Sequence, residues 1–142
     1  KLLNDGTIAL AAAGERMLGI FLGVNYKDST GKAQFGHWPA STTATDIKAK
    51  VVVDPNVTFE VMSGGTPTSA DVGQLADHVT GTGNAYTQTS AAYLNSSTGT
   101  GSAGFRILGL VDKPGNSGQY AVLEVQPFEW EFAYHGQATI GV

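Results

Sequence analysis

The sequence MLGIFLGVNYKDSTGKAQFGHW, residues 17–38, has the pattern of a β-hairpin. Its first ten residues are apolar, aromatic or β-branched, which is typical of a largely buried strand. A polar turn containing Gly31 follows over residues 27–32, and residues 33–38 return as a second strand. Pro39 ends that strand, because proline lacks the N–H that a sheet requires. The stretch therefore predicts two paired strands.

The pattern of strand, turn and strand recurs directly downstream. The sequence DIKAKVVV, residues 46–53, alternates apolar and polar side chains before it becomes wholly apolar. Asp54-Pro55-Asn56 is a turn signal, because proline fixes φ and the Asp and Asn side chains bond the nearby backbone. The sequence VTFEVM, residues 57–62, alternates cleanly. We therefore expect residues 46–53 and 57–62 to pair as a second hairpin.

The C-terminal third also predicts strands. Residues 105–111, FRILGLV, form a strong strand pattern, and a turn-rich connector over 112–118 leads to a returning strand over 119–126. In that strand Ala121, Leu123 and Val125 share one face. Further strands are expected at residues 7–13, near 91–94, and at 139–142. FEWEF, residues 128–132, alternates aromatic and acidic side chains and predicts a strand with one packed face.

The sequence contains one plausible helix, over residues 67–79. Ser69 is a suitable N-cap, and Val72, Leu75 and Val79 have helical spacing, whereas Gly73 weakens the helix. We expect one or two turns. The predicted fold class is all-β, a small β-barrel or β-sandwich with at most one short helix, in a single domain over residues 1–142.

Composition limits the classes of function. The 142 residues carry a net charge of −4 and no cysteine, so disulfides and thiolate metal sites are excluded. The few basic residues argue against a nucleic-acid partner. No apolar run approaches the roughly 20 residues that span a bilayer, so no membrane partner is expected. Charged residues make up 14% of the chain, against roughly 25% in ordinary domains. A surface so poor in charge suits either coverage by partners or a Thr-rich extracellular or viral β-protein.

One motif resembles a dinucleotide-binding loop. TGTGSAGF, residues 98–105, contains the spacing GxGxxG between Gly99 and Gly104. A dinucleotide site requires a strand before this loop and a helix after it, so that the helix N-terminus binds the pyrophosphate. Here a Ser/Thr-rich loop precedes and a predicted strand follows. The glycines are therefore assigned to tight turning and close packing, and no cofactor is expected.

Other chemistry-bearing residues form no strong pattern. His37, His78 and His135 are not spaced as metal ligands, so no metal site is predicted. Glu129 and Glu131 would share a strand face, as two carboxylates of a glycosidase-like site could. Such an alternation is also what any strand with one wet face shows, and we favour that interpretation. The sequence predicts a protein that is not an enzyme.

The ordered set of β-motifs resembles the head decoration, or cement, proteins of tailed bacteriophages. The resemblance covers about Gly19 to Val125. Its features are the GVxYxDxxGK hairpin at 23–32, the Trp38-Pro39 stop, DPNVxFEV at 54–61, and FRILGL at 105–110 followed by a Pro- and Asn-containing loop. The family has a long leader before this region. The chain begins at Lys1 without one, and we expect an N-terminal leader to be missing from it.

The resemblance implies a virion structural protein without catalytic activity. Such a protein binds the outer surface of an icosahedral capsid and stabilises it by clamping neighbouring capsomers. The implied partners are the major capsid protein and further copies of the chain, as a trimer or dimer. The residues assigned to capsid or subunit contact are Leu2, Leu3, Phe35, His37 and Trp38.

A second function class stays open on the aromatic residues. A carbohydrate-binding β-sandwich of a phage fibre or extracellular protein would present a row of rings for sugar stacking. Trp38, Tyr86 and Tyr93 could form that row.

Overall fold

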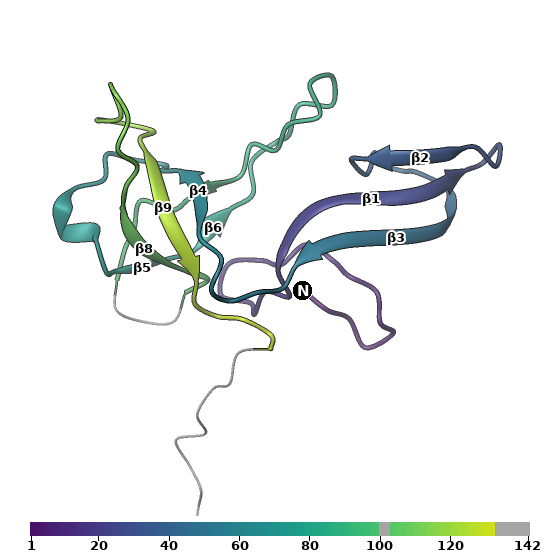
Figure 1. Cartoon of the computed structure of the whole chain (residues 1–142), viewed down its shortest axis with the longest axis horizontal. Helices are drawn as coiled ribbons and strands as arrows, with labels where there is room; N and C mark the ends of the chain where they lie inside the picture. Colours follow the sequence, from purple (N-terminus) through teal and green to yellow (C-terminus); the bar gives the residue numbers. More distant parts are fainter. Residues whose placement is uncertain (100–102, 133–142) are drawn as a thin grey trace, which may run out of the picture.

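The protein is described by a computed structural model that covers residues 1–99 and 103–132 (Figure 1). The prediction of an all-β class is confirmed, because these residues form three open sheets and a single 3₁₀ turn. The expected strand at 139–142 lies outside the described residues. The elements are β1 Ile20–Asp28, β2 Ala33–Gly36, β3 Ala44–Val52, β4 Phe59–Met62, η1 Ser69–Asp71, β5 Leu75–Ala76, β6 His78–Val79, β7 Tyr93–Leu94, β8 Phe105–Leu110 and β9 Val122–Pro127.

One sheet forms an arm, defined here as residues 20–52, which projects from the rest of the molecule (Figure 1). The order is β2-β1-β3 and both pairings are antiparallel. The hairpin predicted from residues 17–38 is confirmed, with Val24 opposite Gly36 and Lys27 opposite Ala33. Two register shifts interrupt the pairing of β1 with β3, between Phe21 and Gly23 and between Asn25 and Lys27. Such bulges bend and twist a strand pair.

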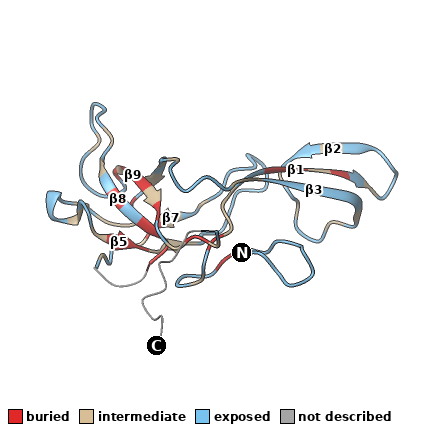
Figure 2. Cartoon of the chain, turned by 60° about the horizontal axis from the view of Figure 1, so that its bottom comes forward, coloured by how far each residue is buried: buried red, intermediate tan, exposed pale blue. Residues whose placement is uncertain are grey.

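The body, defined here as the β4-β9-β8-β5 sheet with the β6-β7 pair, contains most of the core. Figure 2 shows many of the buried positions on β5, β8 and β9, while β2 and β3 of the arm are mostly exposed and β1 is buried in part. The predicted sharing of one face by Ala121, Leu123 and Val125 is confirmed, since all three are buried on the inner side of the sheet. Leu94 and Ile107 pack in the same cluster. Burial of this apolar surface is the main stabilising term of the body.

The expected pairing of residues 46–53 with 57–62 is wrong. Both segments form strands, but β3 pairs with β1 in the arm and β4 pairs with β9 in the body. The turn between them is present, with the Asn56 N–H donating to the Asp54 carboxylate at 2.8 Å. This turn carries the chain from one sheet to the other instead of reversing it into a hairpin.

The expected helix over residues 67–79 is also wrong beyond a single 3₁₀ turn. Thr68, not Ser69, precedes that turn, and its N–H donates to the Asp71 carboxylate at 2.7 Å. Gly73 then adopts a positive φ of 85°, which ends the helical path. The chain continues as β5 and β6, because Leu75 and Ala76 pair with β8. Tertiary pairing overrides the helical spacing of the apolar residues.

Two further predicted strands are not formed as expected. Residues 7–13 make one isolated bridge, between Ile8 and Leu2, instead of a strand. Strand β9 ends at Pro127, and within the described residues 128–132 Trp130 alone makes a bridge, parallel to Met17. Trp130 is fully buried as expected, whereas Phe128 and Phe132 are exposed. The strand expected near 91–94 is confirmed as the two-residue β7.

Candidate functional site

The arm presents two unlike faces. Register places Asn25, Phe35 and Lys48 side by side on one face, because Asn25 lies opposite both of the other residues. Lys27 and Lys50 belong to the same face by strand alternation and by their own pairings. We call this the lysine face. Phe35 on it is 71% exposed, so a large ring is held in solvent among cationic side chains.

The opposite face of the arm is aromatic. Tyr26 is buried, and its ring meets Trp38 edge-to-face at a centroid distance of 5.1 Å. Val24 is buried on the same face, while Ile47 of β3 is 52% exposed. The segment after β2 therefore covers part of this face and leaves the rest open. Edge-to-face packing of this kind contributes about 0.5–1.5 kcal/mol beyond the buried area.

The five residues predicted for capsid or subunit contact do not form one patch. Phe35 lies on the lysine face, and Trp38 packs against the aromatic face. His37, between them, is half-buried. Leu2 and Leu3 are both exposed and lie in the N-terminal segment, outside the arm. Their assignment to contact stays a prediction, now divided among three surfaces.

The turn at the end of the arm is organised by one carboxylate. Asp28 Oδ1 accepts from the Thr30 hydroxyl at 2.6 Å, from the Thr30 N–H at 2.9 Å and from the Lys32 N–H at 3.1 Å. Its Oδ2 accepts from Gln34 Nε2 at 2.8 Å. Gly31 has a positive φ of 81°, a conformation that favours glycine in this turn. The predicted turn over 27–32 is thus confirmed and rigidly bonded.

These bonds lower the pKa of Asp28 to about 2, with the Thr30 hydroxyl as the largest cause and Gln34 next. Because the folded pKa lies below the ordinary value of 3.8, the turn's stabilising contribution is full above that value. It is lost as pH falls through about 2. We expect an NMR titration of the Asp28 carboxyl carbon to give this low pKa, and Thr30→Val to raise it. An unchanged pKa in the variant would contradict the assignment of the hydroxyl.

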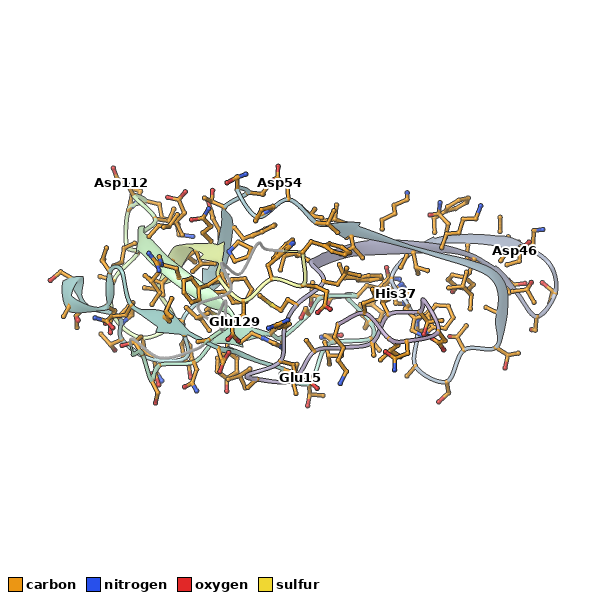
Figure 3. All side chains as sticks on the ribbon, turned by 90° about the horizontal axis from the view of Figure 1, so that it is seen from below. Glu15, His37, Asp46, Asp54, Asp112 and Glu129 are labelled. Carbon is orange, nitrogen blue, oxygen red and sulfur yellow. The ribbon has the colours of Figure 1, made fainter. Side chains whose placement is uncertain are left out.

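The titratable residues considered for chemistry do not converge. Figure 3 shows His37 and Glu129 lying apart from each other. Glu129 and Glu131 are half-buried and lie in no strand, so the shared strand face proposed for them is absent. Instead, the Met17 N–H donates to the carbonyl oxygen of Glu129 at 3.1 Å, and the Glu131 N–H donates to the carbonyl oxygen of Met17 at 2.8 Å. Across residues 1–99 and 103–132, no three His, Asp or Glu side chains are grouped as a metal site requires.

The histidines are dispersed among unrelated environments. His78 Nε2 lies 2.9 Å from the carbonyl oxygen of Ala11, and its ring meets Phe105 edge-on at 6.5 Å. This contact joins the N-terminal segment to the body. His135 falls outside the described residues.

The glycine-rich loop that resembles a dinucleotide motif leads directly into β8. A Cβ on Gly104 would lie 3.3 Å from Met17 Cε, and the Gly104 N–H donates to the Asp77 carboxylate at 2.9 Å. Gly104 therefore serves close packing at the start of a strand. Residues 100–102 of the motif lie outside the described residues.

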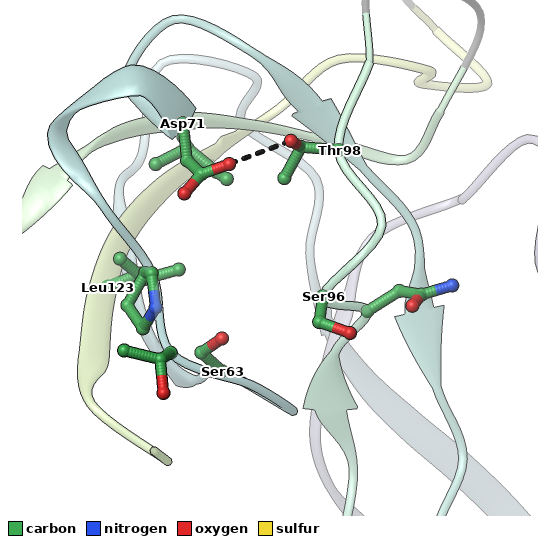
Figure 4. Close-up of a pocket in the computed structure, with 9 residues that line it drawn as sticks. Ser63, Asp71, Ser96, Thr98 and Leu123 are labelled. Atoms are coloured by element: carbon green, nitrogen blue, oxygen red, sulfur yellow. Dashed lines mark hydrogen bonds between the residues drawn. The ribbon is translucent and has the colours of Figure 1, made fainter. Parts of the chain in front are cut away.

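A small cavity lies between the 3₁₀ turn, β7 and β9 (Figure 4). Asp71 points into it. Its Oδ1 accepts from the Thr98 hydroxyl at 2.8 Å, and its Oδ2 accepts from the Thr68 N–H and the Thr68 hydroxyl. These bonds lower the pKa of Asp71, the Thr68 N–H being the largest cause. Both carboxylate oxygens are used within the chain. The cavity has a volume of about 20 Å³, which suits a single water molecule rather than a ligand.

No protein-family model, curated protein or solved structure matches this chain. Among the described residues there is also no helix with the length and apolar character needed to cross a bilayer.

Proposed function

We propose that this chain is a virion structural protein that binds the outer surface of an icosahedral phage capsid and clamps neighbouring capsomers. The observation that carries the proposal is the projecting arm. Leu22 and Phe35 are 67% and 71% exposed there, and Phe21 and Ile47 are also exposed, so both faces of the arm carry accessible apolar side chains. Exposed apolar patches of this kind mark interaction surfaces. The order of β-motifs that resembles decoration proteins supports the choice of partner, the major capsid protein.

The charge-poor surface supports the same proposal. Contacts that last require about 1,000 Å² or more of buried surface, and repeated sites on a symmetric shell add avidity. A chain in which charged residues make up 14% has little charge to desolvate over so large an area. The function proposed is therefore assembly, without catalysis or a bound cofactor.

Co-sedimentation with expanded, empty shells of the major capsid protein from the same genome tests the proposal. We expect saturable pelleting at a fixed ratio to capsid subunits. Leu22→Ser combined with Ile47→Ser, at two exposed apolar side chains of the arm, is expected to weaken pelleting at least about tenfold, because anchor side chains dominate binding energy. Tyr86→Ser, at a fully exposed ring outside the predicted contact set, is the matched control. Absence of pelleting with intact shells would overturn the proposal.

One observation favours the carbohydrate-binding alternative. Tyr86 is 95% exposed at the tip of a loop closed by the bridge between Asn84 and Thr89. A ring in this position could stack on a sugar. However, Tyr93 is half-buried in β7 and Trp38 packs on Tyr26, so the three rings come from separate elements. Glycan-array binding that Tyr86→Ser abolishes would favour this function over capsid binding.

A further inference from the structure

Charge is divided unevenly between the arm and the rest of the chain. Residues 20–52 contain four lysines and two aspartates, a net charge of +2. Because the whole chain carries −4, the remaining residues carry −6. On the arm, Asp46 pairs with Lys27 at 2.6 Å. Lys48 and Lys50 are exposed and form no ion pair with any residue that the structure describes.

The body carries a matching acidic feature on the solvent face of its large sheet. Glu60 of β4 lies directly opposite Glu124 of β9, and both are exposed. Like charges placed directly opposite each other destabilise a strand pair. On the other side of Glu124 the partner residue is Gly109, which has no side chain, and the nearest cation on β8, Arg106 opposite Gln126, lies over the Phe128 ring at 4.8 Å. Neither glutamate forms an ion pair within residues 1–99 and 103–132.

Apolar surface adjoins this acidic pair. Met62, two residues after Glu60 on the same strand face, and Leu108, beside Gly109, are exposed. Beyond Gly109 there is open space, since an added Cβ would meet no atom within 4 Å. The acidic face, defined as Glu60, Met62, Leu108, Gly109 and Glu124, therefore combines two carboxylates that form no ion pair within the described residues with apolar side chains and open space beside Gly109.

We propose that the lysine face of the arm docks on the acidic face of a second copy of this chain. Lys48 and Lys50 would approach Glu60 and Glu124, and the exposed Phe35 ring would lie against Met62 and Leu108. Alternate residues of one strand are about 6.5–7 Å apart. Directly opposed residues are about 4.5–5.5 Å apart. Flexible lysine side chains can adjust to that difference. The arm projects from its own body (Figure 1), so a second copy supplies the acidic face.

The two faces are distinct surfaces, so each copy both gives an arm and receives one. A reciprocal exchange closes a two-fold dimer, and a head-to-tail series closes a ring. Either assembly neutralises the Glu60–Glu124 repulsion and covers Phe35. The inference concerns self-association alone, and it does not depend on the proposed capsid function.

Sedimentation velocity of the full chain at low ionic strength tests the inference, with charge-swapped variants. Wild type is expected to sediment as an oligomer that dissociates as salt is raised, because exposed ion pairs are screened. Lys48→Glu with Lys50→Glu, and separately Glu60→Lys with Glu124→Lys, are each expected to weaken association at least about a hundredfold through like-charge contacts. Mixing the two variants should restore a complex. Lys32→Glu with Lys113→Glu, which makes the same charge change in the β1–β2 turn and the β8–β9 connector, outside the residues that define the two faces, should leave association unchanged.

Three results would overturn the inference. They are a monomeric wild type at low salt, variants that assemble like wild type, or a mixture of the two variants that stays monomeric. Circular dichroism verifies that each variant is folded, and the neutral pair Glu60→Gln with Glu124→Gln provides a milder test if a reversal does not fold. Loss of shell binding without loss of self-association would count against the capsid contact alone, so the two proposals fail separately.

Discussion

Replacing Trp130 with alanine is expected to lower the free energy of unfolding by about 3–5 kcal/mol, as large-to-small changes in a core do. Trp130 has no exposed surface, and its indole Nε1–H donates to the carbonyl oxygen of Val53 at 3.1 Å. Its backbone bridges Met17. Through its backbone and its indole ring, Trp130 thus links the N-terminal segment and the residue that follows the arm to the segment after β9. Its removal leaves a cavity at the junction of all three.

Urea unfolding followed by far-ultraviolet circular dichroism measures this loss. Trp130→Phe retains an aromatic ring without the indole donor and should cost less than the alanine variant. Phe128→Ala is the matched control two residues away. Phe128 is 39% exposed with Arg106 over its ring at 4.8 Å, so its loss should cost about 1 kcal/mol or less. Equal losses for Trp130→Ala and Phe128→Ala would contradict the role assigned to Trp130.

Local pattern predicted most strands, because side-chain alternation and turn residues act over a few positions. The hairpin formed by β1 and β2, and the face shared by Ala121, Leu123 and Val125, could be predicted in this way. The pairing of β3 could not be obtained in that way. The signal at Asp54-Pro55-Asn56 describes a turn, and the same turn serves equally to reverse a chain or to pass it to another sheet. Partner choice depended on β1 and β9, which lie far away in the sequence.

The helix expected over residues 67–79 does not form, for a related reason. Val72, Leu75 and Val79 have helical spacing, but Leu75 is buried by pairing with β8, and Gly73 turns with a positive φ. The Gly73 N–H donates to the carbonyl oxygen of Ile107 at 2.8 Å. In an α-helix it would instead donate to the carbonyl oxygen of Ser69, four residues earlier. A short apolar pattern does not distinguish a helix from two short strands when the partner strand is distant.

The candidate site was only partly readable in the sequence. Phe35 and Trp38 were assigned together to capsid or subunit contact, but their position on opposite faces follows from the register of β1 with β2. The lysine face did have a local signal, since Lys48 and Lys50 alternate with apolar residues in DIKAKVVV. The acidic pair had none, because Glu60 and Glu124 are 64 positions apart and meet through β4–β9 pairing.

Gly19→Ala is expected to destabilise the base of the arm, by about 1–3 kcal/mol or more, as overpacking does in a tight site. A Cβ on Gly19 would overlap the carbonyl oxygen of Val52 and would lie 2.5 Å from Val51 Cγ1. The Val52 oxygen belongs to the backbone of β3, which cannot rotate away as a side-chain tip can. Relief therefore requires the first residues of β1 to separate from β3, where Ile20 pairs with Val52.

Gly109→Ala provides the matched control, because it adds the same methyl group in a strand with no atom within 4 Å of the new Cβ. Its unfolding free energy should stay within about 0.5 kcal/mol of wild type. Hydrogen exchange adds a local measurement. In Gly19→Ala, the β1 and β3 amides near Val52 should exchange faster than in Gly109→Ala. Equal unfolding free energies and equal protection of these amides in both variants would contradict the idea that close β1–β3 contact anchors the arm. The docking of the arm that we propose depends on this anchor.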